Sequence, residues 1–511
     1  MSEGVDQKKQ PEVAYVEEEP RNAKNSAMDS ELQKYTADEA IYIDEDTSKR
    51  LKRKIDKRVL PVLIITYMCQ ALDKGTLSFA SIMGLIEDTN LVGQQYSWLT
   101  TCVYIAILVA EFPTNWVIQK VPTAKYLSLN VVLWGACVAC QAACSSFAPL
   151  LVLRILLGIF ETCCQPIFII ISSMWYRRDE QAKTISLWYC MNGMNQIVGG
   201  LLAYCFSLIQ GAKMKGWQVF FLTYGLVTVV YGMFISWWLP DSPMKAKCWS
   251  EEDKMLMVER VRENQTSLQN KKFKWDQFWE ALKDPQTWAY ALLKFLTALP
   301  SGGLGAYQGI LVSSFGFTTL QTQLLAMVQG VWQIFILLSS LWVVKKCNNQ
   351  TILVMFCYPI LSVIGTVVLI AVPYDDTVRT RAALLFCFYI CLSYWATDSL
   401  TLSLLSRNVA GRTKKSVAIA MCFIGWACGN AVGPQTFIAS DAPRYPRAFA
   451  TQLACYIVVF IILISLRLWL MRCNRNKDEK IQQGEAEEDK NLQHAFDDLT
   501  DFQNQSFRYA Y

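Results

Sequence analysis

The sequence predicts an all-α membrane protein with twelve transmembrane helices arranged as two six-helix, pseudo-symmetric bundles. Hydrophobic residues make up 53% of the 511 residues and charged residues 18%, which is too apolar for a soluble protein of this size. A helix needs about 20 apolar residues to cross a hydrocarbon core of about 30 Å. The chain contains twelve stretches of roughly that length, far more than a single membrane anchor requires.

The twelve stretches fall into two sets of six, separated by a polar loop. The first set consists of 59–81, 98–117, 126–143, 150–174, 185–209 and 217–239. The second set consists of 288–312, 324–344, 351–372, 382–406, 416–438 and 449–471. The predicted organisation is therefore a tail at 1–58, a first bundle at 59–239, a central loop at 240–286, a second bundle at 287–471 and a tail at 472–511.

Lysine and arginine are unevenly distributed among the loops. They are concentrated in the two tails and after the second, fourth, eighth and tenth stretches, whereas the loops after the first, third and seventh contain none. Because positively charged loops stay in the cytosol, both termini are predicted to be cytosolic. The sequence 1–58 lacks the pattern of a cleaved signal peptide, and the polar segment 474–511 is expected to be poorly ordered.

The central loop contains two helix signals. Ser250 precedes three acidic residues, which is the pattern of a helix N-terminus. Further along, Phe278, Trp279 and Leu282 fall on one side of a second predicted helix, beside several lysines. That helix is expected either to lie on the cytosolic membrane surface or to be an ordinary linker between the bundles, and the sequence favours neither.

The two sets resemble each other weakly at the start of their fifth helices. A basic loop leads into a helix rich in small residues from position 177 in the first half and from position 411 in the second. Aligning the two stretches places Gln196 on Asn430 and Gly199 on Gly433. An internal repeat of this kind is typical of transporters built from duplicated halves.

Several longer stretches are similar to one known family. They include LDKGTLSFASIMGL from position 72, QQYSWLTTCVYIAILVAEFPTNWVIQKVPTAKYL from 94, LRILLGIFETCCQPIFIIISSMWYRRDEQ from 153, ENQTSLQNKKFKWDQFWEALKDPQTW from 263 and GNAVGPQTF from 429. In these stretches the chain resembles the major facilitator superfamily, and within it the allantoate permease type of the fungal anion:cation symporter family. The acidic, glycine-rich loop of the wider superfamily is replaced here by QKVPTAK, a change that the narrower group accommodates.

The resemblance implies a secondary active transporter in the plasma membrane that works as a monomer without a cofactor. Its expected substrate is a small organic anion such as allantoate or ureidosuccinate, imported together with protons. Membrane lipids are expected to surround the protein. Export of a host metabolite uses the same fold and stays open as an alternative. A nutrient sensor signalling through its tails is disfavoured, because the C-terminal tail is short.

Enzymatic and nucleic-acid-binding functions are not supported. The sequence has no phosphate-binding loop, nucleophile elbow or metal-ligand spacing, so neither a metal nor ATP is expected. The net charge of +5 reflects the basic loops and gives no nucleic-acid signal.

Two pairs of charged residues inside the predicted membrane stretches are the main candidates for a functional site. Asp73 and Lys74 are adjacent in the first stretch, and Arg154 and Glu161 lie two helical turns apart on one face of the fourth. Charges in a bilayer are costly and are usually functional, although each pair is also interpretable as an internal neutraliser that supports packing. In the functional interpretation, Lys74 and Arg154 attract the substrate anion, and Asp73 and Glu161 bind and release the proton.

The resemblance supports these roles. Bacterial sugar-acid symporters of the same broad family have Asp-Arg on the first helix and Arg and Glu on the fourth, which implies corresponding roles for Asp73, Lys74, Arg154 and Glu161. Lysine here replaces arginine, which puts bidentate carboxylate binding at that position in doubt. The single histidine, His494, lies in the C-terminal tail, so proton coupling is expected to depend on carboxylates.

Other polar residues in the membrane stretches are weaker candidates. The further candidates for substrate binding are Asn192, Gln196, Tyr307, Gln308 and Asp398. Asn192 and Gln196 are equally explained by interhelical hydrogen bonding. Asp398 is expected either to contact substrate or to pair with a cation, while Glu111 and Asn430 are expected to have gating or structural roles.

Overall fold

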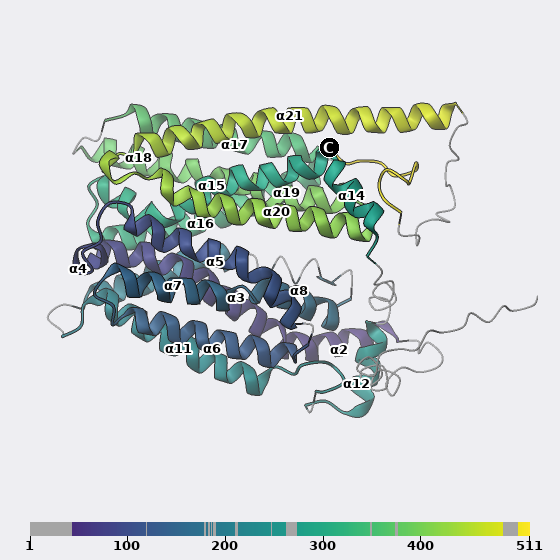
Figure 1. Cartoon of the computed structure of the whole chain (residues 1–511), viewed down its shortest axis with the longest axis horizontal. Coiled ribbons are helices and arrows are strands. Elements are labelled where there is room, and N and C mark those ends of the chain that lie inside the picture. The colour runs from purple at the N-terminus through teal and green to yellow at the C-terminus, as the bar shows by residue number, and fades with distance from the viewer. Residues whose placement is uncertain are drawn as a thin grey trace, which may run out of the picture.

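The structure is a computed structural model in which every regular element is a helix (Figure 1). It describes residues 43–118, 120–177, 180, 181, 184, 187, 191–209, 213–246, 248–261, 273–347, 350–373, 377–483 and 499–511. The all-α expectation is confirmed. Most of the N-terminal tail, part of the fifth predicted stretch and the central loop from 262 to 272 lie outside the described residues.

The first half contains the helices of the first predicted bundle. They are α2 (Glu45–Arg58), α3 (Leu60–Ala80), α4 (Ile86–Asp88), α5 (Gln95–Ile118), α6 (Thr123–Gln141), α7 (Phe147–Glu161), α8 (Cys164–Trp175), α10 (Met191–Ser207) and α11 (Gly216–Trp238). A π-helical turn, η1 (Ser81–Leu85), joins α3 to α4. Helices α7 and α8 follow one another along a single membrane crossing.

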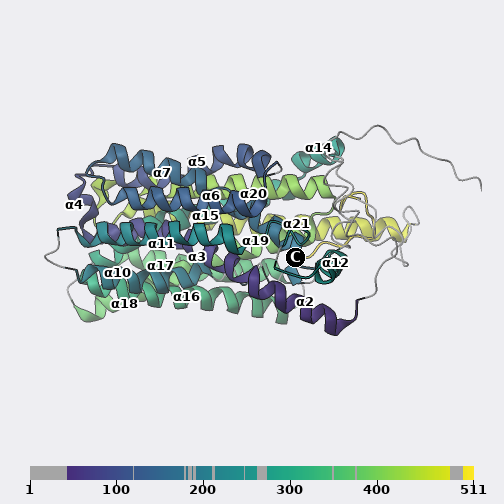
Figure 2. The same ribbon diagram turned by 90° about the horizontal axis from the view of Figure 1, so that it is seen from below.

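The second half repeats this plan. Its helices are α15 (Pro285–Ser314), α16 (Thr319–Lys346), α17 (Thr351–Ala371), α18 (Val378–Cys391), α19 (Trp395–Asn408), α20 (Arg412–Val432) and α21 (Pro446–Gln482), with short turns η2 (Leu392–Tyr394), η3 (Gly433–Thr436) and η4 (Ala439–Asp441). Within the described residues, nine helical segments are long and apolar enough to cross a membrane. Helices α3, α10 and α15 run alongside them and complete the two sets of six (Figures 1 and 2).

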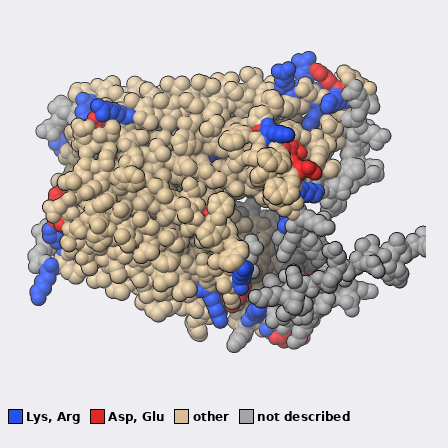
Figure 3. Space-filling view, viewed as in Figure 1, with Lys and Arg blue, Asp and Glu red and all other residues tan. Residues whose placement is uncertain are grey.

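The two halves lie side by side with their long helices roughly parallel (Figures 1 and 2). Helices α2, α12 and α14 gather at one end of the bundle, which we call the tail end, and α4 and α18 lie at the opposite, distal end. On the face drawn in Figure 3, charged side chains sit mainly near these two ends, and few are visible between them. This distribution is expected for a protein whose middle lies in lipid.

Glycines allow helices of the second half to approach closely. A Cβ atom on Gly425, Gly429 or Gly433 would lie within 2.2–2.4 Å of a main-chain oxygen of α15. No real side chain tolerates such a contact, so α20 and η3 pack against α15 backbone to backbone. Small residues serve this purpose at many membrane helix interfaces.

The two helices of the central loop belong to different halves. Helix α12 (Glu251–Arg260) begins as predicted, with the Ser250 hydroxyl accepting a hydrogen bond of 3.3 Å from the Asp253 amide. The Asp253 carboxylate also pairs with Lys54 of α2, in the first half. Helix α14 (Trp275–Lys283) instead packs on α20, where the Gln277 side chain accepts a 3.0 Å hydrogen bond from the Thr413 amide.

One side of α14 is not covered by the rest of the protein. Gln277 and Ala281 are buried against the second half, whereas Phe273, Trp275 and Trp279 are each more than half exposed. Helix α14 lies at the tail end of the molecule (Figure 2). Two of the lysines predicted beside it, Lys271 and Lys272, lie outside the described residues.

The expectation of a poorly ordered C-terminal tail is wrong for its described residues. Helix α21 continues without interruption to Gln482. Residues 499–511 then pack against the tail end of the second half, where the Ala510 amide donates to Asn408 at 2.7 Å and the Thr351 amide donates to the Tyr511 carbonyl at 3.1 Å. Composition missed this segment because its contacts are polar and depend on partners far away in the sequence.

Candidate functional site

The four charged residues predicted from the sequence form one cluster in the first half. The Lys74 Nζ atom on α3 lies 2.9 Å from Glu161 Oε1 at the end of α7. Asp73 interacts electrostatically with Arg154, Glu161 and Lys74. Asp73 and Glu161 are fully buried and Arg154 is 3% exposed. The seven-residue spacing on α7 therefore does place Arg154 and Glu161 on the face that meets α3.

Several polar atoms of this cluster lack hydrogen bonds of normal geometry. Both carboxylate oxygens of Asp73 and the Nε and Nη2 atoms of Arg154 are buried without such a partner among the described residues. Buried polar groups are nearly always paired in folded proteins, and exceptions usually mark places where water, an ion or a ligand binds. The cluster thus has unused capacity for both an anion and a proton.

The cluster faces the second half of the molecule. The Lys74 ammonium lies 5.6 Å from the centre of the Trp426 ring on α20. The same ring packs edge-on against Tyr104 of α5, with ring centres 5.6 Å apart. Lys74 is also the most exposed of the four, at 26% for its side chain. Charge in the first half therefore borders an aromatic wall of the second.

A chain of amides crosses between the halves on the distal side of this cluster. The Gln308 Nε2 atom of α15 donates to Gln196 of α10 at 3.1 Å, and Gln329 of α16 donates to Gln308 at 2.7 Å. A small cavity opens here between α3, α15 and α16. Asn192 lies one turn before Gln196 on α10 and donates to the Tyr67 hydroxyl within the first half at 2.9 Å.

Aromatic and hydroxyl side chains join the two halves at the distal end. The Tyr96 hydroxyl of α5 donates to the Ala306 carbonyl of α15 at 2.7 Å, and the Ser97 and Tyr307 hydroxyls are 2.7 Å apart. The Tyr307 ring stacks on Phe437, with centres 4.5 Å apart. Tyr307 is 5% exposed, so in this state it closes the distal end of the interface between the halves.

Asp398 is one member of a second buried ion pair. Its Oδ1 atom on α19 lies 2.6 Å from the Lys294 ammonium of α15 and accepts a 2.9 Å hydrogen bond from the Thr297 hydroxyl. The sequence reasoning named Asp398 but missed Lys294. Lys294 is a lone lysine inside the apolar stretch ALLKFLTALP, which is the same signal of an intramembrane charge that Lys74 gives.

The two residues expected to have gating or structural roles lie away from the charges. Glu111, in the tail-end part of α5, accepts a 3.0 Å hydrogen bond from Asn115. Asn430 donates to the Trp426 carbonyl at 2.9 Å within α20. A Cβ atom on Gly302 would meet the Asn430 backbone at 2.5 Å, so Asn430 sits in the tight α15–α20 contact.

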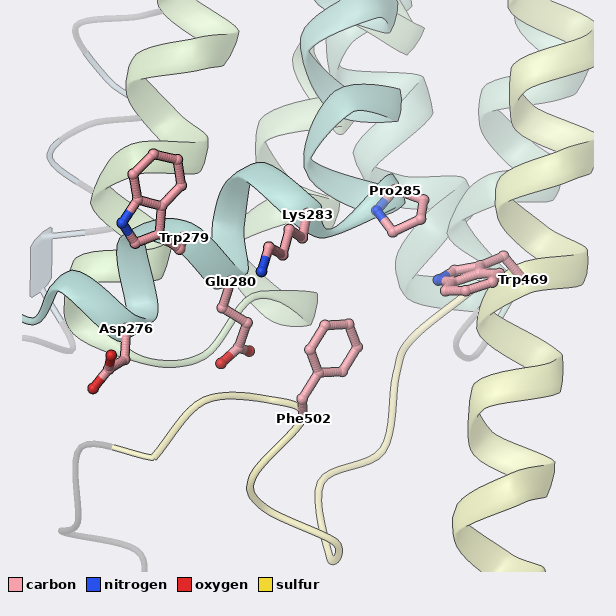
Figure 4. A pocket seen from close by; sticks show the side chains of 7 residues that line it. All are labelled: Asp276, Trp279, Glu280, Lys283, Pro285, Trp469 and Phe502. Carbon is pink, nitrogen blue, oxygen red and sulfur yellow. The ribbon is translucent and has the colours of Figure 1, made fainter.

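A surface recess at the tail end is a separate feature (Figure 4). It lies between α14, the start of α15, α21 and the docked C-terminal segment. Its lining residues are Asp276, Trp279, Glu280, Lys283, Pro285, Trp469 and Phe502. The recess is open to the surface at the tail end of the second half and is remote from the central cluster, so it is not part of the central site.

Comparison with known proteins identifies the family. Residues 63–434 match the family model described as Major Facilitator Superfamily. The chain is 32% identical over 92% of its length to the allantoate permease of Saccharomyces cerevisiae, covering 88% of that protein. It is 34% identical over 92% of its length to a thiamine pathway transporter of the same yeast, again covering 88% of it.

The fold comparison agrees. A D-xylose-proton symporter structure superimposes with a TM-score of 0.60, covering 79% of this chain and 96% of that one at 12% identity. These similar proteins are transporters rather than enzymes, in keeping with the sequence reading. The paired six-helix halves, the charges buried within each half and the family match lead to one conclusion: this chain is a transporter that belongs to the Major Facilitator Superfamily.

Proposed function

We propose that the protein imports a small organic anion together with protons, by alternating access of the central cluster to the two sides of the membrane. The observation that supports this most directly is the buried group of two cations and two carboxylates on α3 and α7. Lys74 and Arg154 supply the attraction for an anion, and Arg154 has unused hydrogen-bond donors. Asp73 and Glu161 are the carboxylates available to exchange protons.

Coupling follows from the Lys74–Glu161 contact. When Glu161 is ionised it occupies Lys74, at 2.9 Å. Protonation of Glu161 would release Lys74 for the substrate carboxylate, so proton and anion binding would favour each other. Loss of the proton on the other side would restore the ion pair and expel the anion.

The substrate class is proposed from charge and similarity together. The allantoate permease named above supports a carboxylate or ureide such as allantoate or ureidosuccinate. The thiamine pathway transporter at comparable identity indicates that specificity varies within this group. The cationic pair favours an anionic substrate in either case.

The membrane orientation is also a proposal. The basic loops and tails favour a cytosolic tail end. With the tail end inside the cell, the Tyr96, Ser97 and Tyr307 contacts would close the outer side. We place the protein in the plasma membrane as a monomer with both termini cytosolic, in line with the permease-like relatives.

The test is uptake of radiolabelled allantoate by cells lacking their own permeases, at acidic and neutral outside pH, with and without an uncoupler. We expect uncoupler-sensitive uptake that is stronger in acid. Glu161→Gln should abolish accumulation while leaving substrate exchange measurable, and Glu87→Gln, at an exposed distal position, serves as the matched control. Uphill uptake by Glu161→Gln at the natural rate would refute the proton role, and efflux without influx would favour export.

A further inference from the structure

The second half contains an ion pair that the coupling scheme above does not use. Lys294 and Asp398 are 3% and 6% exposed, and their charged atoms are 2.6 Å apart. Lys294 also donates to the Asp398 main-chain carbonyl at 3.2 Å, and Thr297 donates to the carboxylate. Such a pair is expensive to bury, and replacing both partners with apolar residues is often neutral or stabilising. Packing alone is therefore a weak reason for its presence.

The pair joins the same two membrane crossings as the Lys74–Glu161 pair of the first half. Helix α3 is the first membrane crossing of the first half and α7 belongs to the fourth; α15 is the first crossing of the second half and α19 belongs to the fourth. In both halves a lysine on the first crossing meets a carboxylate on the fourth, as Lys74 meets Glu161 and Lys294 meets Asp398. Duplicated transporter halves place their sites at the interface between the repeats.

A polar stripe on α15 links this pair to the interface between the halves. Thr297, Ser301 and Gln308 lie three, seven and fourteen residues after Lys294. On a helix with 3.6 residues per turn these positions fall within about 60° of one another. At its distal end the stripe reaches the first half, because Gln308 hydrogen-bonds across to it. At its tail end Lys294 and Thr297 contact Asp398 of α19.

Open space lies beside the stripe. Gly305 falls on the same face, is exposed, and would meet no atom within 4 Å if it had a Cβ. Ser301, one turn closer to the tail end, is only half-buried. The stripe thus leads from the central amide network, past an unfilled position, to Lys294, which lies about 21 Å along the helix toward the tail end.

We propose that Lys294 is a second anion-binding residue on the path of the substrate, and that Asp398 occupies it when no substrate is there. An anion that leaves Lys74 and Arg154 toward the tail end would replace the Asp398 carboxylate at Lys294 before release. The proposal rests on the proposed import of an anion and extends that site into the second half. The proposal predicts that the Lys294 cation contributes to substrate affinity, whereas the Asp398 carboxylate only pairs with Lys294 when no substrate is bound.

The first experiment measures the KM of radiolabelled allantoate uptake in three variants. Lys294→Met should raise the KM about tenfold or more, and Asp398→Asn should leave it unchanged or lower. The double variant Lys294→Met/Asp398→Asn has no unpaired charge and should fold, yet keep the raised KM. Lys346→Met, at the exposed end of α16, is the control and should behave like the natural protein. A natural KM in the double variant would show a neutralising pair and overturn the proposal.

A second experiment needs no substrate. The Gly305→Cys side chain has room beside it, and its reaction with anionic and cationic methanethiosulfonate reagents is compared after normalising each rate to a free thiol and subtracting the background of the natural chain. The preference for the anionic reagent should rise severalfold when Asp398→Asn frees Lys294, and Lys294→Met/Asp398→Asn should remove that rise. No rise with Asp398→Asn, or the same rise without Lys294, would overturn the proposal. If the natural protein takes up no allantoate, the import proposal fails, while this comparison still tests Lys294.

Discussion

Replacing Lys414 should destabilise the second half more than replacing any one of its acidic partners. The Lys414 ammonium is completely buried at the start of α20. It lies 3.0 Å from Glu280 of α14, 2.9 Å from Asp284 at the start of α15 and 2.8 Å from Asp501 of the docked C-terminal segment. One amine on α20 therefore joins the neighbouring elements α14 and α15 to the C-terminal segment, which is distant from both in the sequence.

The expected magnitudes follow from burial. Lys414→Met leaves the Asp284 and Asp501 carboxylates, both fully buried, without the amine that they share; losing one partner of a buried pair costs about 3–5 kcal/mol. Burial raises the pKa of Asp284, an effect that Lys414 opposes, so without Lys414 this acid can take up a proton and limit the loss. Asp501→Asn should cost only about 1–2 kcal/mol, because Lys414 keeps two carboxylates.

The assay is thermal unfolding of the purified protein in detergent, read together with hydrogen exchange at Ala510, whose amide donates to Asn408. The apparent melting temperature should fall in the order natural protein, Asp501→Asn, Lys414→Met, and protection at Ala510 should fall in both variants. Lys415→Met, next along the helix and partly exposed, is the matched control. An Asp501→Asn protein less stable than Lys414→Met would contradict the electrostatic reasoning.

Three further predictions test other parts of the structure. Gly429→Ala should lower the melting temperature by the equivalent of about 1–3 kcal/mol, because its methyl group would strike α15. Gly305→Ala has free space beside it and should leave the melting temperature unchanged. Equal losses of stability in the two variants would refute the tight contact. Tyr307→Phe keeps the stacked ring but loses the cross-half hydroxyl contact, so spin labels at the distal end should show a larger open population, and an unchanged distance distribution would count against a closing role. The Lys54 hydrogen bond lowers the pKa of Asp253, so the α2–α12 contact should be intact above the ordinary value of 3.8 and weaken as pH falls below it. Protection factors in α12, corrected for the intrinsic pH dependence of exchange, that stay constant from pH 5 to pH 3 would contradict this.

Hydropathy predicted the helices of this protein well because lipid leaves the chain little choice. Every main-chain polar group in the bilayer must be paired within a helix, and the hydrocarbon thickness sets its length. The N-terminus of α12 was equally predictable, since a serine before three acids satisfies free amides locally. Features that depend on interactions between residues close together in the sequence were therefore predictable.

Contacts between distant helices were not visible in this way. The spacing of Arg154 and Glu161 predicted a shared face, but only the fold of the first half brings Lys74 of α3 to Glu161 of α7. Asp398 was recognised without its partner Lys294, which lies more than a hundred residues earlier. The docked segment 499–511 was misjudged for the same reason, because its polar composition says nothing about buried partners elsewhere.

The hydrogen bonds that close the distal end between the two halves are strong enough to keep it closed and weak enough to let it open. Its hydrogen bonds from Tyr96, Ser97 and Thr101 all end on main-chain carbonyls of the second half. Each such bond is worth about 0.5–1.5 kcal/mol net, and water can satisfy both partners once the halves separate. The closed and open states then differ by a few kcal/mol, the range in which a ligand that prefers one state shifts the population. On the proposed mechanism, binding of an anion or a proton to the charged cluster beside Trp426 would change the local charge at the same interface and would bias which end is open.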